Sequence, residues 1–136
     1  DLDIYANMFD SEDGSDISPS RTVGFSRRVW GINQENLVDV AKVSDTHLGL
    51  SDRELEPEII EIYGSPSKYY RLYARNYAQG DMLEEEVTMD IFKVDSDGND
   101  GLLLGSFTKE PSLFHQNDAR VYFFDFAIET ERLVGL

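Results

Sequence analysis

The sequence predicts an all-β fold, an antiparallel β-sandwich of about six to eight strands. Short stretches rich in β-branched and aromatic residues recur along the chain, and turn-forming residues separate them roughly every ten residues. Hydrophobic residues make up 40% and aromatic residues 12% of the chain, which is enough to pack a core despite the high charge. Because 136 residues are typical of one domain, we expect residues 1–136 to form a single sandwich.

The first half of the chain contains four predicted strands. Residues 2–9 alternate between apolar side chains on one side and Asp1, Asp3 and Tyr5 on the other, as in a half-buried strand. Residues 10–16 combine acids with turn formers, so we expect a surface loop there. The other predicted strands of this half are 22–30, 37–43, for which one helical turn is the alternative, and 57–63.

Four more strands are predicted in the second half. Residues 68–77 carry aromatic side chains on both faces, which is typical of a strand inside a sandwich. Residues 86–94 and 102–108 flank an Asp-Gly-rich turn and are predicted to form a hairpin. In the last strand, 119–128, we expect one face to hold Val121, Phe123 and Asp125 and the other Tyr122, Phe124, Phe126 and Ile128.

Composition excludes several functions. The 27 acidic and 12 basic residues give a net charge of −15, and such a surface repels phosphate backbones and anionic lipid, so we expect no nucleic-acid partner. No apolar run reaches the length of a membrane span, so we expect no membrane insertion. The absence of cysteine excludes disulfides and thiolate metal sites. The chain begins with Asp and shows no signal-peptide pattern, which suggests a domain excised from a longer or processed protein.

Paired acids on the first predicted strand suggest a metal site. Asp1 and Asp3 are two residues apart, so their carboxylates project from the same face, with roughly 7 Å between Cα atoms. Calcium takes about six to eight oxygen ligands, so other groups must complete the shell, and Asp52 and Glu56 are the nearest candidates by pattern. The alternative is a pair of surface acids that needs no ion.

Two other acidic segments are weaker calcium candidates. Residues 95–101 place acids at the first and third positions of a calcium loop, but Asp100 and Ser106 stand where an EF-hand needs glycine and glutamate. A hairpin turn is the favoured interpretation. Residues 10–16 could hold a weakly bound ion, although a solvated loop is the simpler expectation.

Familiar catalytic motifs are missing from the sequence. His47 and His115 are the only histidines, and the chain has neither a Gly-x-Ser-x-Gly motif nor a glycine-rich phosphate loop. Asp125 interrupts an apolar run, and a buried aspartate satisfied by an arginine or by backbone is favoured over a catalytic acid. The aromatic residues that could line a sugar or peptide platform, with burial in the core as the alternative, are Trp30, Tyr63, Tyr69, Tyr70, Tyr73 and Tyr77.

The order of these features resembles known families. The features are the Asp1-Leu2-Asp3-Ile4 opening, an acidic turn with Gly14, the segment Pro57-Glu58-Ile59, the strand Tyr70-x-Leu72-x-Ala74-x-Asn76-Tyr77, and the strand 87–94 before an Asp-Gly turn. Over residues 1–101 they resemble bacterial β-sandwich domains of uncharacterised function that open with Asp-x-Asp. A weaker similarity is to the calcium-binding tellurite-resistance stress domains. The resemblance implies a calcium ion held by Asp1, Asp3 and Asp52.

From these patterns we predict a calcium-stabilised, non-catalytic binding or adhesion module of a larger bacterial surface or secreted protein. Its partners would be a divalent cation and a protein or glycan ligand, in an extracellular, periplasmic or cell-surface setting. One alternative is a structural component of a virion or surface layer that packs against copies of itself. The other is a small glycan hydrolase that uses two carboxylates.

Overall fold

The structure, a computed structural model, describes residues 2–24, 27–44, 58–76, 84–95, 101–116 and 119–136. These residues form ten β-strands and one short 3-10 helix, which confirms the predicted all-β class with more strands than expected. No helix of this described part is long and apolar enough to cross a membrane. The elements in chain order are β1 (Leu2–Phe9), β2 (Arg21–Val23), β3 (Val29–Asn33), β4 (Val38–Ser44), β5 (Ile59–Tyr63), β6 (Tyr69–Asn76), β7 (Val87–Lys93), β8 (Leu102–Lys109), η2 (Pro111–Phe114), β9 (Arg120–Ala127) and β10 (Arg132–Gly135).

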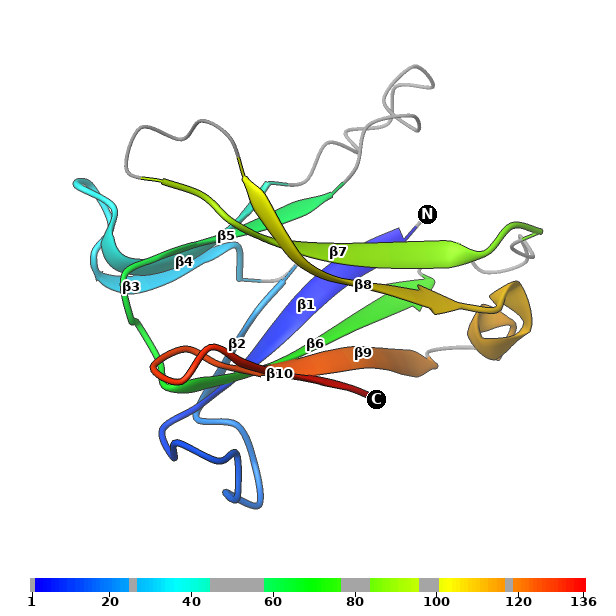
Figure 1. The fold of residues 1–136 in the computed structure, drawn as a ribbon, viewed down its shortest axis with the longest axis horizontal. Coiled ribbons are helices and arrows are strands. Elements are labelled where there is room, and N and C mark those ends of the chain that lie inside the picture. The colour runs from blue at the N-terminus through cyan, green and yellow to red at the C-terminus, as the bar shows by residue number, and fades with distance from the viewer. Residues whose placement is uncertain (1, 25–26, 45–57, 77–83, 96–100, 117–118) are drawn as a thin grey trace.

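The strands form three antiparallel sheets that pack as a sandwich. The largest sheet has the order β10-β9-β6-β1-β2, and the smaller ones are β3-β4-β5 and the hairpin β7-β8. In Figure 1 the hairpin is drawn over β1 and β6. One core cluster takes side chains from all three sheets, among them Met8 and Phe124 of the large sheet, Val43 of β4 and Met89 of β7. The two small sheets therefore cover the inner face of the large one.

Alternation on the central strands decides which side chains reach this core. Ala6 and Met8 of β1 and Tyr70 and Leu72 of β6 point inward and are almost fully buried. The intervening residues point to the outer face, because successive side chains of a strand project to opposite sides. This division matches the alternation predicted for 2–9 and 68–77, and it leaves the odd-numbered residues of both strands for the outer face.

The predicted strand 22–30 is wrong as a single element. The chain leaves the large sheet after Val23 and re-enters the fold as β3 in a different sheet. The Gly24 amide donates a hydrogen bond to the Arg27 carbonyl at 2.9 Å, between the end of β2 and the start of β3. The segment 37–43, for which a helical turn was the alternative, is confirmed as a strand by the pairing of β4 with β3 and β5.

A β-bulge overturns the alternation predicted for 119–128. Leu72 of β6 pairs with Phe124, but the next residue, Tyr73, pairs with Tyr122, so Phe123 is an extra residue on β9. Phe123 and Phe124 are both buried, at 0% and 2% exposure. Such a bulge reverses which side chains face outward beyond it. Tyr122 therefore joins the outer face, which strict alternation would have assigned to Phe123.

Candidate ligand-binding site

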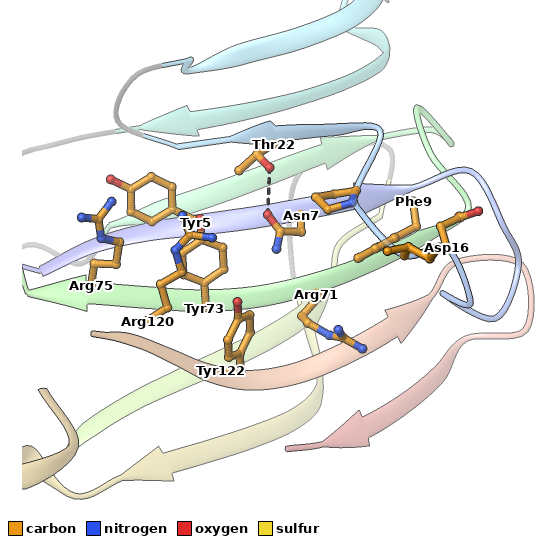
Figure 2. Close-up of a pocket in the computed structure, with 12 residues that line it drawn as sticks. Tyr5, Asn7, Phe9, Asp16, Thr22, Arg71, Tyr73, Arg75, Arg120 and Tyr122 are labelled. Carbon is orange, nitrogen blue, oxygen red and sulfur yellow. Dashed lines mark hydrogen bonds between the residues drawn. The ribbon is translucent and has the colours of Figure 1, made fainter. Parts of the chain in front are cut away.

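An open hollow of about 420 Å³ lies on the outer face of the large sheet. That volume falls within the usual range for small-ligand sites. Strands β1, β2, β6 and β9 form its floor, and the loop between β1 and β2 forms one wall (Figure 2). We call it the tyrosine–arginine hollow, and its lining residues are Tyr5, Asn7, Phe9, Asp16, Ile17, Pro19, Thr22, Arg71, Tyr73, Arg75, Arg120 and Tyr122.

Three tyrosines form a row across the floor. Tyr5 pairs in register with Tyr73, which pairs with Tyr122, so the row crosses three neighbouring strands. The rings of Tyr5 and Tyr73 are stacked with centroids 5.0 Å apart and planes 6° apart. Tyr122 follows with its centroid 5.3 Å from that of Tyr73 and its plane tilted by 49°. At 36% exposure Tyr122 is the most accessible of the three.

Stacking leaves little free ring face on the two inner tyrosines. One face of Tyr5 is covered by Tyr73, and the backbone of Gly24 packs so closely on its ring that an added Cβ would lie 2.0 Å from Cδ1. Tyr73 lies between Tyr5 and Tyr122 and is only 3% exposed. A sugar ring stacks on the electronegative face of an aromatic ring and not on its electropositive edge. The inner part of the row is therefore poorly suited to stacking a sugar ring.

Arg71 is the best-anchored cation of the hollow. Its Nε and Nη2 donate hydrogen bonds to the two carboxylate oxygens of Asp125 at 2.7 and 2.8 Å, in bidentate geometry. The hydroxyl of Tyr69 donates a third hydrogen bond to the same carboxylate at 2.7 Å. Asp125 is 4% exposed. The prediction that Asp125 is buried and satisfied by an arginine is therefore confirmed.

Arg75 and Arg120 lie side by side at one end of the hollow, because they are paired in register on β6 and β9. The guanidinium of Arg75 lies 5.9 Å from the ring centroid of Tyr5, and that of Arg120 lies 5.5 Å from the ring centroid of Tyr73. Both separations are within cation–π range. No carboxylate of the described residues forms an ion pair with Arg120, which is exposed to solvent.

Burial raises the pKa of the two inner phenols, Tyr5 and Tyr73. It raises the pKa of Tyr73, and the nearby Arg120 guanidinium only partly opposes this effect. Burial also raises the pKa of Tyr5, and the carboxylate of Asp3 raises it further. Neutral phenols can donate hydrogen bonds, and arginines remain charged over the whole physiological range. The floor of the hollow therefore presents donors and positive charge.

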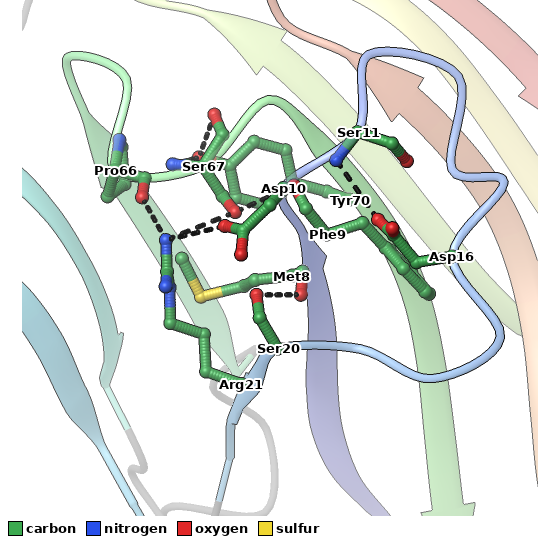
Figure 3. Close-up of polar contacts among 10 residues, drawn as sticks. All are labelled: Met8, Phe9, Asp10, Ser11, Asp16, Ser20, Arg21, Pro66, Ser67 and Tyr70. Carbon is green, nitrogen blue, oxygen red and sulfur yellow. Dashed lines mark hydrogen bonds and ion pairs between the residues drawn. The ribbon is translucent and has the colours of Figure 1, made fainter.

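The loop that walls the hollow is tied down at both ends (Figure 3). The amide and the hydroxyl of Ser20 both donate to the Met8 carbonyl, at 2.9 and 3.0 Å. Arg21 donates from Nη2 to the Pro66 carbonyl at 2.7 Å and forms an ion pair with Asp10 at 3.4 Å. These contacts hold the wall against the sheet.

Within this loop, local hydrogen bonds and one glycine set the shape. The Ser11 amide donates to Asp16 Oδ2 at 3.0 Å. Gly14 has a φ of +68° and packs against the ring of Tyr69, where an added Cβ would lie 2.5 Å from Cε1. Only glycine adopts this positive φ without strain and also leaves room for the Tyr69 ring. The loop thereby holds Asp16 at the hollow and leaves the side chain of Ile17 fully exposed, at 104%.

The predicted calcium ligands are only partly within the described structure. Asp3 lies on the outer face of β1, opposite Arg75 in register, and is 5% exposed. Asp1 and Asp52, together with Glu56, lie outside the described residues. Among the residues that are described, no group of three or more histidine, cysteine or acidic side chains could hold a metal ion. Calcium binding by Asp1, Asp3 and Asp52 stays a prediction.

The aromatic residues singled out from the sequence do not form one platform. Tyr70 is a core residue, and the Trp30 ring is covered by the Arg21 guanidinium at 3.5 Å from its centroid. Tyr63 hydrogen-bonds to Glu61 on β5, Tyr69 to Asp125, and Tyr77 lies outside the described residues. Of this set, Tyr73 alone lines the hollow.

Sequence reasoning missed Tyr5, Tyr122 and the three arginines as members of one site. A usable signal was present on β6, where Arg71, Tyr73 and Arg75 are spaced two apart and so share a face opposite Leu72 and Ala74. The same spacing occurs in Arg120 and Tyr122 on β9. Their alignment across strands depends on the register and the bulge, which the sequence pattern does not contain.

Comparison with known proteins identifies no relative. A scan against protein-family models and searches of curated proteins and of solved structures found no match to this chain. The resemblance to Asp-x-Asp-opening bacterial sandwich domains and to tellurite-resistance stress domains therefore stays a prediction.

Proposed function

We propose that this domain is a non-catalytic binding module and that it holds an anionic ligand in the tyrosine–arginine hollow. The observation that carries the proposal is Arg120, which lines the hollow, is exposed and forms no ion pair with the described residues, whereas Arg71 is paired with Asp125 and Arg75 is in register with Asp3. Arginine is the side chain best suited to carboxylate, sulfate and phosphate groups, because its planar fork donates two parallel hydrogen bonds. One exposed guanidinium on a domain whose net charge is −15 favours a ligand with a single anionic group over a polyanion.

The lining groups are suited to recognition. Arginine does not give up its proton at physiological pH, and the raised pKa of Tyr5 and Tyr73 keeps their phenols neutral there. Such groups bind and orient a ligand more readily than they transfer protons. The carboxylate of Asp125 already accepts three hydrogen bonds, two from Arg71 and one from Tyr69, which leaves it poorly placed to act as an acid or base.

Calcium stabilisation and an extracellular setting belong to the same proposal. They are supported by the acidic composition and by the paired acids of the first strand, as argued from the sequence. A bound ion close to Asp3 would lie beside the arginine end of the hollow, since Asp3 is in register with Arg75. Its positive charge would add to the attraction for an anion there.

Binding of small anions can be followed by NMR, with acetate, sulfate and a uronic acid tetrasaccharide as probes and a neutral tetrasaccharide as the control. We expect the anionic probes, and not the neutral one, to shift the Nε–H signal of Arg120. The variant Arg120→Ala should lose the response, whereas Arg27→Ala, which removes an exposed arginine outside the hollow, should retain it. An absence of any anion-dependent shift around the hollow would contradict the proposal.

A second candidate is the self-associating structural component predicted as an alternative from the sequence. Four apolar side chains on or next to the β7–β8 hairpin are more than half exposed, namely Phe92 at 53%, Val94 at 52%, Leu102 at 64% and Leu103 at 51%. Contiguous exposed apolar surface favours association. Light scattering distinguishes the two candidates, since a stable oligomer that Phe92→Ser dissolves would favour the structural role.

A further inference from the structure

Charge is unevenly distributed across the arginine end of the hollow. Asp3, Arg75 and Arg120 follow one another in register on β1, β6 and β9, so the row contains one negative and two positive side chains. Like charges directly opposite each other on neighbouring strands repel. Within the described chain Arg120 forms no ion pair, and it is exposed. A carboxylate supplied by a ligand could therefore pair with Arg120.

The opposite end of the hollow has a different chemistry. There the β1–β2 loop contributes Ile17 and Pro19, and Ile17 is fully exposed. Figure 2 shows Arg75 and Arg120 at one end of the site and Phe9 and Asp16 at the other. An exposed isoleucine beside a ligand site gains free energy by contact with an aliphatic group, because contact removes apolar surface from water. A ligand that fills the hollow therefore needs an acidic end and an aliphatic end.

The length of the hollow sets the separation of these two ends. The floor extends along β1 and β6 from the level of Arg75 to the level of Phe9, which pairs with Tyr69 six positions before Arg75. At the rise of a β-strand this is roughly 20 Å. An extended peptide covers that length with about six residues.

Two other ligand classes fit less well. Stacking of Tyr5 on Tyr73 and packing of Gly24 against Tyr5 leave Tyr122 as the one accessible ring of the row, which is a small platform for a saccharide. A polyanion such as a nucleic acid is repelled by the net charge of −15, whereas a chain with one acidic side chain is repelled much less.

We propose that the hollow binds an extended segment of a protein partner, with one acidic side chain at Arg120 and one aliphatic side chain against Ile17. This rests on the proposed function of the hollow as an anion-binding site and names the partner class. Because a carboxylate can take two hydrogen bonds from a guanidinium, the acidic side chain fixes the register of the segment. The aliphatic contact at the far end fixes its direction.

The experiment uses synthetic peptides of about eight residues, blocked at both ends, composed of serine and threonine with one glutamate and one leucine at varied separations. Binding to the whole domain is measured by fluorescence anisotropy. We expect the tightest binding when glutamate and leucine are about six residues apart. Replacing the glutamate by glutamine should weaken binding about tenfold or more, as expected for loss of charge-assisted hydrogen bonds.

Variants of the domain test the two contacts separately. Arg120→Ala should remove the preference for glutamate over glutamine, while Ile17→Ser should keep that preference and remove the contribution of leucine. Arg27→Ala serves as the matched control with unchanged binding. Both Arg120 and Ile17 are exposed, so circular dichroism and the melting temperature should report folded variants.

The outcomes also separate this inference from the proposed function. Binding of a uronic acid tetrasaccharide through Arg120, with no peptide bound at any glutamate–leucine separation, would overturn the peptide partner and leave the anion site standing. Peptide binding that is independent of both Arg120 and Ile17 would overturn the inference as well. If no peptide, tetrasaccharide or small anion bound, both proposals would fail.

Discussion

The buried carboxylate of Asp125 should be one of the most costly polar groups to remove. It is 4% exposed and accepts hydrogen bonds from Arg71 Nε, Arg71 Nη2 and the Tyr69 hydroxyl. Breaking a fully buried ion pair by removing one partner costs about 3–5 kcal/mol, and an exposed pair contributes about 0–1 kcal/mol. The Arg71 side chain is 36% exposed, so water can rehydrate part of it. We therefore expect Asp125→Ala to lower the free energy of unfolding by about 2–3 kcal/mol.

Urea unfolding followed by the fluorescence of Trp30 measures this loss. With a slope of about 2 kcal/mol/M, the midpoint should fall by roughly 1–1.5 M while the slope stays unchanged. The matched control is Asp90→Ala, because Asp90 is exposed and accepts one hydrogen bond, from Ser106 Oγ at 2.6 Å. That change should cost no more than about 0.5 kcal/mol.

A double-mutant cycle separates the ion pair from general disruption. Asp125→Asn and Arg71→Gln should each destabilise the domain, and the combined variant should be less destabilised than the sum by at least about 1 kcal/mol. A loss below about 1 kcal/mol for Asp125→Ala, or additive effects in the cycle, would refute the view that this contact stabilises the outer face.

Three further predictions concern the core, the site and the metal. Burial raises the pKa of Tyr70 from 10.0 to about 12, so the protonated phenol stabilises the folded state fully below pH 10 and this stabilisation is lost as the pH rises towards 12. The free energy of unfolding should therefore fall by about 2–3 kcal/mol across this range, and the fall should be smaller in Tyr70→Phe. A free energy of unfolding that does not change with pH would argue against this prediction. Gly24→Ala should displace the Tyr5 ring and lower the melting temperature by several degrees, because the new Cβ would lie 2.0 Å from Tyr5 Cδ1. Unchanged NMR signals of the Tyr5 ring would contradict this prediction. Saturating calcium should raise the melting temperature above that in chelator, and Asp3→Asn should reduce the gain; equal melting temperatures by calorimetry would remove the calcium hypothesis.

Much of the fold could be predicted because each strand contains its own local signal. Alternation in 2–9 separated Ile4 from Tyr5 correctly, but that strand is not half-buried, because Tyr5 and Phe9 on its outer face are buried as well. Residues 68–77 were expected to carry aromatic side chains on both faces, and Tyr70 and Tyr73 do lie on opposite faces of β6. The prediction failed where the signal is not local. Residues 22–30 were predicted as one strand, yet β2 and β3 belong to different sheets, and Trp30 of β3 packs against the core cluster.

The candidate site could be predicted only in fragments. The pattern Arg71-x-Tyr73-x-Arg75 places two cations and an aromatic ring on one face of a strand, and this can be read from the sequence. Which residues stand beside them depends on the register of β6 with β1 and β9. The bulge at Phe123 matters most, since without it the outer face would hold Phe123 in place of Tyr122.

The sequence alone determined the all-β class, the net negative charge and the two alternating sides of 2–9 and 68–77, because composition and alternation are properties of each segment. The tertiary structure decided where positive charge gathers. Three arginines from two strands surround one hollow only because β6 pairs with β9 across a bulge and the β1–β2 loop folds against the sheet. Pairing between distant segments depends on packing of the whole core, so it is decided by the sum of many contacts and by no single stretch of the chain.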